Sequence, residues 1–111
     1  MSSFRVRLLS YAKADVQQIY DWLRQRASRG AEAWYNVLQT RLEQLCDDAD
    51  GCEVAAESKR LGEEVRETFF KTRQGRRYRI VFTIFESEVR ILRVRAPGLR
   101  PLKRSDFPND D

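Results

Sequence analysis

One stretch decides the fold: Tyr78-Arg79-Ile80-Val81-Phe82-Thr83-Ile84-Phe85, the most apolar and β-branched segment of the chain. Residues of this kind fit the pleated surface of a sheet, so the segment predicts a central strand over 78–85. Two short polar pairs lie near its ends, Gln74-Gly75 and Glu86-Ser87, at the positions that tight hairpin turns require. The segment is therefore expected to lie between two further strands, each joined to it by a turn.

The neighbouring strands are predicted over 65–73 and 89–95. In the second of them apolar and basic residues alternate, as they do in a half-buried strand. This alternation would place Leu92 and Val94 on one face and Ile91, Arg93 and Arg95 on the other. Ala96-Pro97-Gly98 then ends the sheet, because proline and glycine interrupt the hydrogen-bond ladder.

The N-terminal half predicts one strand and two helices. Alternating residues predict the strand over 4–8, and apolar residues at helical spacing predict helices over 13–27 and 31–46. Ser10 is placed to cap the first helix, and Ser28-Arg29-Gly30 is expected to form the turn between the two. A connection this short makes the helices an antiparallel hairpin.

The predicted fold class is α+β: an N-terminal strand, an α-helical hairpin, then a three-stranded antiparallel meander, with the helices packed on one face of a small antiparallel sheet. The acidic segment 47–64 is expected to be a surface loop with room for one helical turn. A chain of 111 residues fits one domain. We assign that domain to residues 1–104 and expect a polar, mobile tail over 105–111.

Composition excludes several kinds of site. The sequence contains no histidine, which removes Ser-His and Cys-His nucleophile systems and most zinc or iron sites. Cys46 and Cys52 cannot hold zinc alone, and we expect neither a metal nor a cofactor. No apolar run approaches the roughly 18 residues of a membrane span, and charge stands at the start where a signal peptide needs an apolar stretch. We therefore expect a soluble, cytoplasmic protein without membrane contact.

Charge is distributed unevenly along the chain. The formal net charge is +4, but residues 66–104 carry twelve basic and three acidic side chains, whereas residues 43–64 carry eight acidic and two basic ones. Most of the basic residues are arginines, whose flat guanidinium suits carboxylate and phosphate partners. The basic half predicts an acidic-protein or polyanionic partner. The alternative is a solvated surface with scattered ion pairs.

Five segments in a fixed order carry a family resemblance. They are Ala14-Asp15-Val16-Gln17-Gln18-Ile19-Tyr20-Asp21-Trp22-Leu23, Ala33-Trp34-Tyr35, Leu61-Gly62-Glu63-Glu64-Val65-Arg66-Glu67, Gly75-Arg76-Arg77-Tyr78-Arg79-Ile80-Val81-Phe82 and Val89-Arg90-Ile91-Leu92-Arg93-Val94-Arg95. Spread over nearly the whole chain, they resemble the ParE/RelE family of toxins from bacterial type II toxin–antitoxin modules. The resemblance is closest to the ParE-like, plasmid-stabilisation branch.

This resemblance implies a toxin held inactive by a cognate antitoxin, whose acidic C-terminal segment folds onto it. ParE-like members inhibit DNA gyrase without being nucleases, which implies a block of replication and growth arrest. RelE-like members instead act as endoribonucleases that cleave messenger RNA on the ribosome and inhibit translation. A third reading is a decayed, non-toxic module that keeps antitoxin binding.

The residues themselves argue against RNA cleavage. The endoribonuclease branch uses basic residues, which Arg66, Arg79, Arg95 and Arg100 resemble, together with a tyrosine or histidine near the C-terminus. Here no tyrosine follows Tyr78, and Phe107, the one aromatic residue of the tail, cannot exchange a proton. We therefore assign no catalytic residue and favour a gyrase inhibitor, with the endoribonuclease as the alternative.

The candidate residues for binding the antitoxin or the target are Arg66, Arg79, Arg93, Arg95 and Trp22. Because side chains alternate along a strand, Arg79 is expected on the face opposite Tyr78 and Ile80, which the helices should cover. We expect an exposed Arg79 to be dispensable for folding, within about 0.5 kcal/mol, but needed for a partner. Packing in the core or a solvated sheet face are the structural alternatives for these residues.

Overall fold

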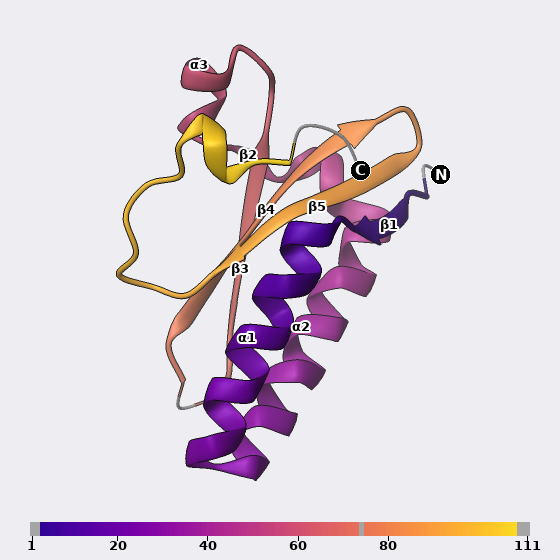
Figure 1. Ribbon diagram of the computed structural model, residues 1–111. Coiled ribbons are helices and arrows are strands. Elements are labelled where there is room, and N and C mark those ends of the chain that lie inside the picture. Colours follow the sequence, from indigo (N-terminus) through magenta and orange to yellow (C-terminus); the bar gives the residue numbers. More distant parts are fainter. Residues whose placement is uncertain (1–2, 74, 109–111) are drawn as a thin grey trace.

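The computed structural model describes residues 3–73 and 75–108, which form one sheet with a helical hairpin on one side (Figure 1). The helices and strands are β1 (Arg5–Leu8), α1 (Ser10–Arg26), α2 (Ser28–Asp48), β2 (Glu53–Val54), α3 (Glu57–Leu61), β3 (Arg66–Lys71), β4 (Arg77–Phe85) and β5 (Glu88–Arg95), with 3-10 turns at Ala49–Gly51 and Arg104–Asp106. Within these residues, no helix is both long and apolar enough to cross a membrane. The α+β class and the order of the main elements confirm the prediction.

The sheet has the strand order β1-β5-β4-β3-β2, so β4 is the central strand, as predicted. The meander β3-β4-β5 is antiparallel throughout, and the turn at Glu86-Ser87 joins β4 to β5. The other expected turn includes Gln74, which lies outside the described residues. One expectation is wrong: β1 pairs with β5 in parallel, so the sheet is mixed. No tight turn fixes the direction of β1, because the helices and the strands β2, β3 and β4 lie between it and β5 in the sequence.

The main core lies between the helical hairpin and the sheet. Helix α2 contributes a stripe of buried residues that follows helical spacing: Trp34, Leu38, Leu42 and Leu45. From the sheet, Ile80 and Phe82 of β4 meet this stripe with no exposed surface. Burying a side chain of this size contributes about 1.5–3 kcal/mol, so this face holds the hairpin on the sheet.

A second cluster covers the opposite face of the sheet. Val81 and Leu92 pack there against Leu102 and Phe107, which follow β5 and fold back across the strands below α3 (Figure 1). Leu102 is 1 % exposed and Phe107 is 9 % exposed. The expectation of a mobile tail from residue 105 is therefore wrong for its described part, and residues 109–111 lie outside that part. Phe107 covers apolar residues of β4 and β5 on the face of the sheet that the helices do not contact.

Both helices begin earlier than predicted. Helix α1 starts at Ser10 itself, with Leu9 as its N-terminal cap, so Ser10 does not have the capping position. Helix α2 starts at Ser28, and the chain reverses at Ala27 alone, an extended residue with φ −161° and ψ 104°. The predicted turn over 28–30 is wrong, because one extended residue is enough to direct the second helix back along the first.

The segment 47–64 contains more structure than the predicted loop with one helical turn. Ala55 is buried, and the two residues of β2 extend the sheet beside β3. Helix α3 supplies the expected helical turn and ends at Gly62, whose φ of 71° suits glycine. A buried carboxylate, Glu57, opens this helix.

A bulge in β5 changes the faces of its residues. Val81 pairs with Arg93 and Phe82 with Ile91, so Leu92 is an extra residue in the ladder. Ile91 and Val94 therefore lie together in the core under the helices, whereas Leu92 belongs to the second cluster. The predicted grouping of Leu92 with Val94 is wrong, because sequence alternation assumes a ladder without insertions.

Candidate functional site

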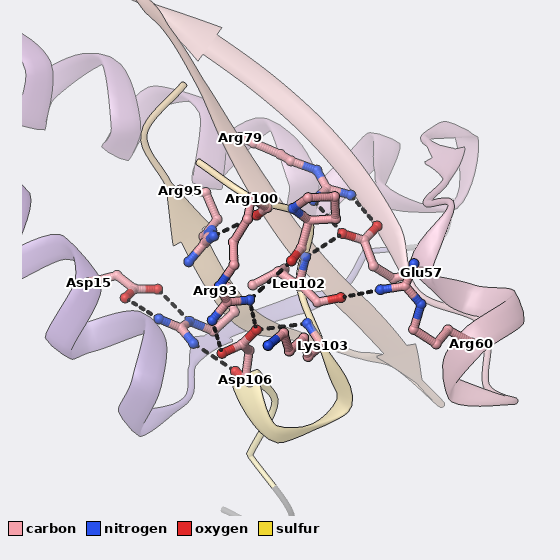
Figure 2. A network of polar contacts seen from close by, with 11 residues as sticks. Asp15, Glu57, Arg60, Arg79, Arg93, Arg95, Arg100, Leu102, Lys103 and Asp106 are labelled. Atoms are coloured by element: carbon pink, nitrogen blue, oxygen red, sulfur yellow. Dashed lines mark hydrogen bonds and ion pairs between the residues drawn. The ribbon is translucent and has the colours of Figure 1, made fainter. Parts of the chain in front are cut away.

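Three of the candidate arginines gather on the sheet face opposite helix α2. Arg79 stands directly beside Arg95, and Arg93 pairs with Val81 of the same face. Tyr78 and Ile80 point into the core under the helices, so the expected side of Arg79 is confirmed. Figure 2 shows these guanidinium groups among side chains from α1, α3 and the segment after β5.

Arg79 is not a free surface cation. Its two terminal nitrogens donate to the Glu57 carboxylate at 2.6 and 2.8 Å (Figure 2), and its Nε donates to Glu67 at 2.7 Å. Glu57 is 5 % exposed and also accepts from the backbone N–H of Leu102 at 3.4 Å. These hydrogen bonds, first those from Arg79, hold the pKa of Glu57 at about 2. The expectation of an exposed Arg79 is therefore wrong. We now expect its removal to destabilise the fold, because a buried carboxylate would lose its partner.

Arg93 has a second carboxylate partner, Asp15 of α1. The two form a bidentate pair with distances of 2.7 and 2.8 Å, and Asp15 also accepts from the Val94 N–H at 2.9 Å. Arg93 further donates to the Asp106 carbonyl at 2.7 Å. The hydrogen bond to Asp15 raises the pKa of Arg93. Arg93 thus joins α1, β5 and the returning C-terminal segment, which is a structural role.

Arg95 stands apart from these pairs. It donates to the backbone carbonyl of Arg100 at 2.8 Å, and no carboxylate within residues 3–73 and 75–108 pairs with it. Burial, and after it the charge of Arg93, lower the pKa of Arg95. Arg100 carries its own partner, Asp106, at 2.7 and 3.0 Å. Arg95 is therefore a partly buried positive charge without a carboxylate in direct contact, which Asp106 and Asp15 offset only from a distance.

Arg79, Arg95 and Arg100, but not Arg93, line an open groove of about 560 Å³, which we call the arginine groove. It lies between α3, the outer face of β3 and β4, and the loop 96–101 that swings out after β5 (Figure 1). Its arginines are Arg60, Arg77, Arg79, Arg95 and Arg100, and its carboxylate is Glu57. Arg77 stacks over the Phe69 ring, 3.7 Å from its centroid. The groove offers a concentration of guanidinium groups with apolar walls.

The other two candidates lie elsewhere. Arg66 pairs with Phe82 in the ladder, so its side chain leaves on the face of the helices, where it donates to the Cys52 carbonyl and to Glu64. Trp22 lies on α1 with 48 % of its surface exposed. Its ring is covered by Arg26 at 3.6 Å and lines a second hollow of about 370 Å³. The structure thus brings together Arg79, Arg93, Arg95 and Arg100 and separates them from Arg66 and Trp22.

Sequence reasoning missed the partners of these arginines. Glu57 stands in a segment that we expected to be loop, and Asp15 looked like an ordinary polar residue of a helix. Each pair spans a large separation along the chain, 22 residues for Glu57 and Arg79 and 78 for Asp15 and Arg93. No local pattern reports such pairs.

The chemistry of the groove is anion binding. Arginine stays protonated, so these side chains can attract and orient negative charge but cannot remove a proton. Glu57 is the carboxylate of the groove, and its pKa of about 2 and its bonds to Arg79 make it a poor general base. The Tyr78 hydroxyl group belongs to a side chain on the other face of β4, where it packs on Trp34.

Comparisons with known proteins find similarity in sequence family and in fold. The family model described as ParE toxin of type II toxin-antitoxin system, parDE, matches residues 6–96. Among solved structures, the chain is similar to one titled "Chromosomal ParDE TA system from P. aeruginosa", with a TM-score of 0.64 and 19 % identity over 84 % of this chain and 95 % of that chain. At this identity the likeness concerns the fold. No curated protein sequence matches the chain.

Proposed function

The chain belongs to the ParE toxin family of type II toxin–antitoxin systems, and from this premise we propose that it inhibits DNA gyrase when free and is neutralised by a cognate antitoxin. Inhibition of gyrase would block replication and arrest growth. The antitoxin in this proposal carries an acidic C-terminal segment, and the site of action is the cytoplasm.

One observation carries the proposal: the arginine groove gathers positive charge around a carboxylate that is already neutralised. Arg79 donates three of its five N–H groups to Glu57 and Glu67, so two carboxylates already offset the charge that a phosphorane-like transition state would need. A site of this kind supports binding of an acidic partner rather than cleavage of a phosphodiester.

The candidate residues for binding the antitoxin or the target differ in how much of their charge or surface is still available to a partner. Arg95 has no carboxylate in direct contact inside the groove, and Trp22 has exposed aromatic surface, so both remain in the proposed partner surface. Arg79 and Arg93 would contribute through the potential of the groove, since their donors already have internal partners. Arg66 lies on the other face and would contact a partner only there.

The endoribonuclease alternative would use Arg66 and Arg79 together with Arg95 or Arg100. Arg66 is on the opposite face of the sheet from Arg79 and Arg95, which argues against a shared site. A decayed, non-toxic module would inhibit neither gyrase nor translation and would not arrest growth.

The purified chain should be added to gyrase in a plasmid supercoiling assay and to a cell-free translation reaction. Our proposal expects loss of supercoiling that the antitoxin encoded beside the chain restores, with translation unchanged. Cleaved transcripts and unaffected gyrase would establish the endoribonuclease instead. Expression of the chain alone in cells without growth arrest would support the decayed module and overturn both active readings.

A further inference from the structure

We propose that the arginine groove and the hollow beside Trp22 form one continuous track for an extended acidic segment of the antitoxin. In this track Arg95 and Arg77 bind carboxylates, and an apolar side chain of the same segment packs against Trp22. The inference rests on the proposed neutralisation by an antitoxin and adds the path and the chemistry of the bound segment.

Ala96 connects the two hollows, because it lines both of them. The arginine groove lies on the outer face of the sheet, and the second hollow lies on the face of the helices, between α1 and the beginning of β4. They meet where β5 ends and β4 begins, so a segment in extended conformation can pass around this end of the sheet. The side chain that the two hollows share is a methyl group, which takes up little space.

Several arginines of the track meet no carboxylate within the described chain. Arg95 and Arg60 each donate to one backbone carbonyl, and Arg77 stacks on the Phe69 ring. Of these, Arg95 and Arg77 stand on the sheet itself. Two guanidinium groups at the ends of neighbouring strands suit acidic side chains spaced along an extended peptide. The pair of Glu57 with Arg79, at 2.6 and 2.8 Å, shows how a carboxylate fits against a guanidinium in this same groove.

The Trp22 hollow supplies the apolar end of the track. Trp22 and Ile19 of α1 form one wall, and Tyr78 of β4 forms another. Phe85 makes a useful contrast: it is 54 % exposed and lies under Arg90, much as Trp22 lies under Arg26, but it stands at the other end of β4 and lines neither hollow of the track. The Trp22 surface is thus concave as well as apolar, and apolar anchors in such hollows supply most of the affinity of an interface.

The same observations disfavour single-stranded nucleic acid as the occupant. Binding of that kind depends on bases that stack on free aromatic faces. Arg77 covers one face of Phe69 and Arg26 covers one face of Trp22, at 3.7 and 3.6 Å from the ring centroids. An acidic peptide needs no stacking surface and gains from every unpaired guanidinium.

The test uses the purified full chain and the full-length antitoxin encoded beside it. Affinity is measured for the parent and for two track variants, Arg95→Gln and Trp22→Ser, each with a matched control. Arg29→Gln removes the same charge from the exposed start of α2, and Phe85→Ser removes an exposed aromatic ring under an arginine. Hydrogen–deuterium exchange of the complex then maps the segments that the antitoxin protects.

We expect each track variant to weaken antitoxin binding about tenfold or more, as the loss of a charged hydrogen bond or an apolar anchor does. The controls should stay within about twofold of the parent, and all variants should keep its melting temperature. Protection should appear both in residues 95–101 and in α1 around Trp22.

Two results would overturn the track while leaving neutralisation intact. The first is antitoxin binding that protects other segments from exchange, and the second is unchanged affinity in both track variants. Absence of any antitoxin binding to the parent would overturn the proposed function and the track together. A short single-stranded oligothymidylate that competes with the antitoxin and loses affinity in Arg95→Gln would identify a nucleic-acid groove instead.

Discussion

Replacement of Arg79 by alanine should destabilise the folded chain by about 2–3 kcal/mol at pH 7. The reason is Glu57, whose side chain is 6 % exposed and whose charge would lose both bonds from Arg79. Breaking a fully buried pair costs about 3–5 kcal/mol, and the 21 % exposure of the Arg79 side chain lowers this figure, because water can reach part of the site. Domains of this size are stable by about 5–15 kcal/mol, so the effect is large.

The pKa of Glu57 gives a second route to the same magnitude. It falls from an ordinary 4.5 to about 2 in the folded protein. A drop of this size corresponds to roughly 3 kcal/mol, at about 1.4 kcal/mol for each pH unit. Since the folded-state pKa is the lower one, this stability is fully present above about pH 5 and is lost as the pH falls toward 2.

The assay is urea unfolding at pH 7 and at pH 3. Arg79→Ala should shift the midpoint strongly at pH 7, and the gap to the parent should narrow by roughly half at pH 3, because a protonated Glu57 needs no cation. Arg90→Ala is the matched control, since it also removes an arginine from the sheet but leaves Glu88 with Arg7 at 3.3 Å. Coincident midpoints for Arg79→Ala and the parent at pH 7 would refute the reasoning.

Three further substitutions test other parts of the structure. Asp15→Ala should cost about 2–3 kcal/mol, because Arg93 and the Val94 N–H both lose a buried acceptor; thermal unfolding measures this, and an unchanged melting temperature would contradict it. Phe107→Ala should cost about 3 kcal/mol in urea unfolding, since the ring is 9 % exposed in the second cluster, whereas a mobile tail predicts no change. Gly62→Ala should cost about 1 kcal/mol in the same assay, because φ of 71° strains any residue with a Cβ, and a stabilised variant would be inconsistent with the left-handed cap.

Local patterns predicted the elements whose periodicity is regular. The run from Tyr78 to Phe85 is the central strand, and the spacing of Trp34, Leu38 and Leu42 gives the buried stripe of α2. Both predictions depend on which side chains share a face, and a regular helix or strand fixes that geometry from one residue to the next.

The features that the sequence did not predict depend on contacts between residues far apart in the chain. Leu92 is an extra residue only in the pairing of β5 with β4, whereas the sequence of β5 alone alternates regularly. Ala27 reverses the chain because the two helices pack together, although glycine and serine nearby looked like better turn residues. In the candidate site, the side of Arg79 could be predicted from alternation, but its partners could not, because Glu57 reaches it from a segment without periodicity.

The parallel pairing of β1 with β5 has a consequence for synthesis of the chain. Arg5 has Glu88 as its partner, so β1 leaves the ribosome 83 residues before the strand that it joins. At translation rates of about 5–20 residues per second, this delay lasts roughly 4–17 s. During that time the helical hairpin can form, but its apolar stripe has no completed sheet to cover it. The finished fold therefore arises only near the end of translation, and a messenger cut short upstream of β5 would yield a chain that cannot close its sheet.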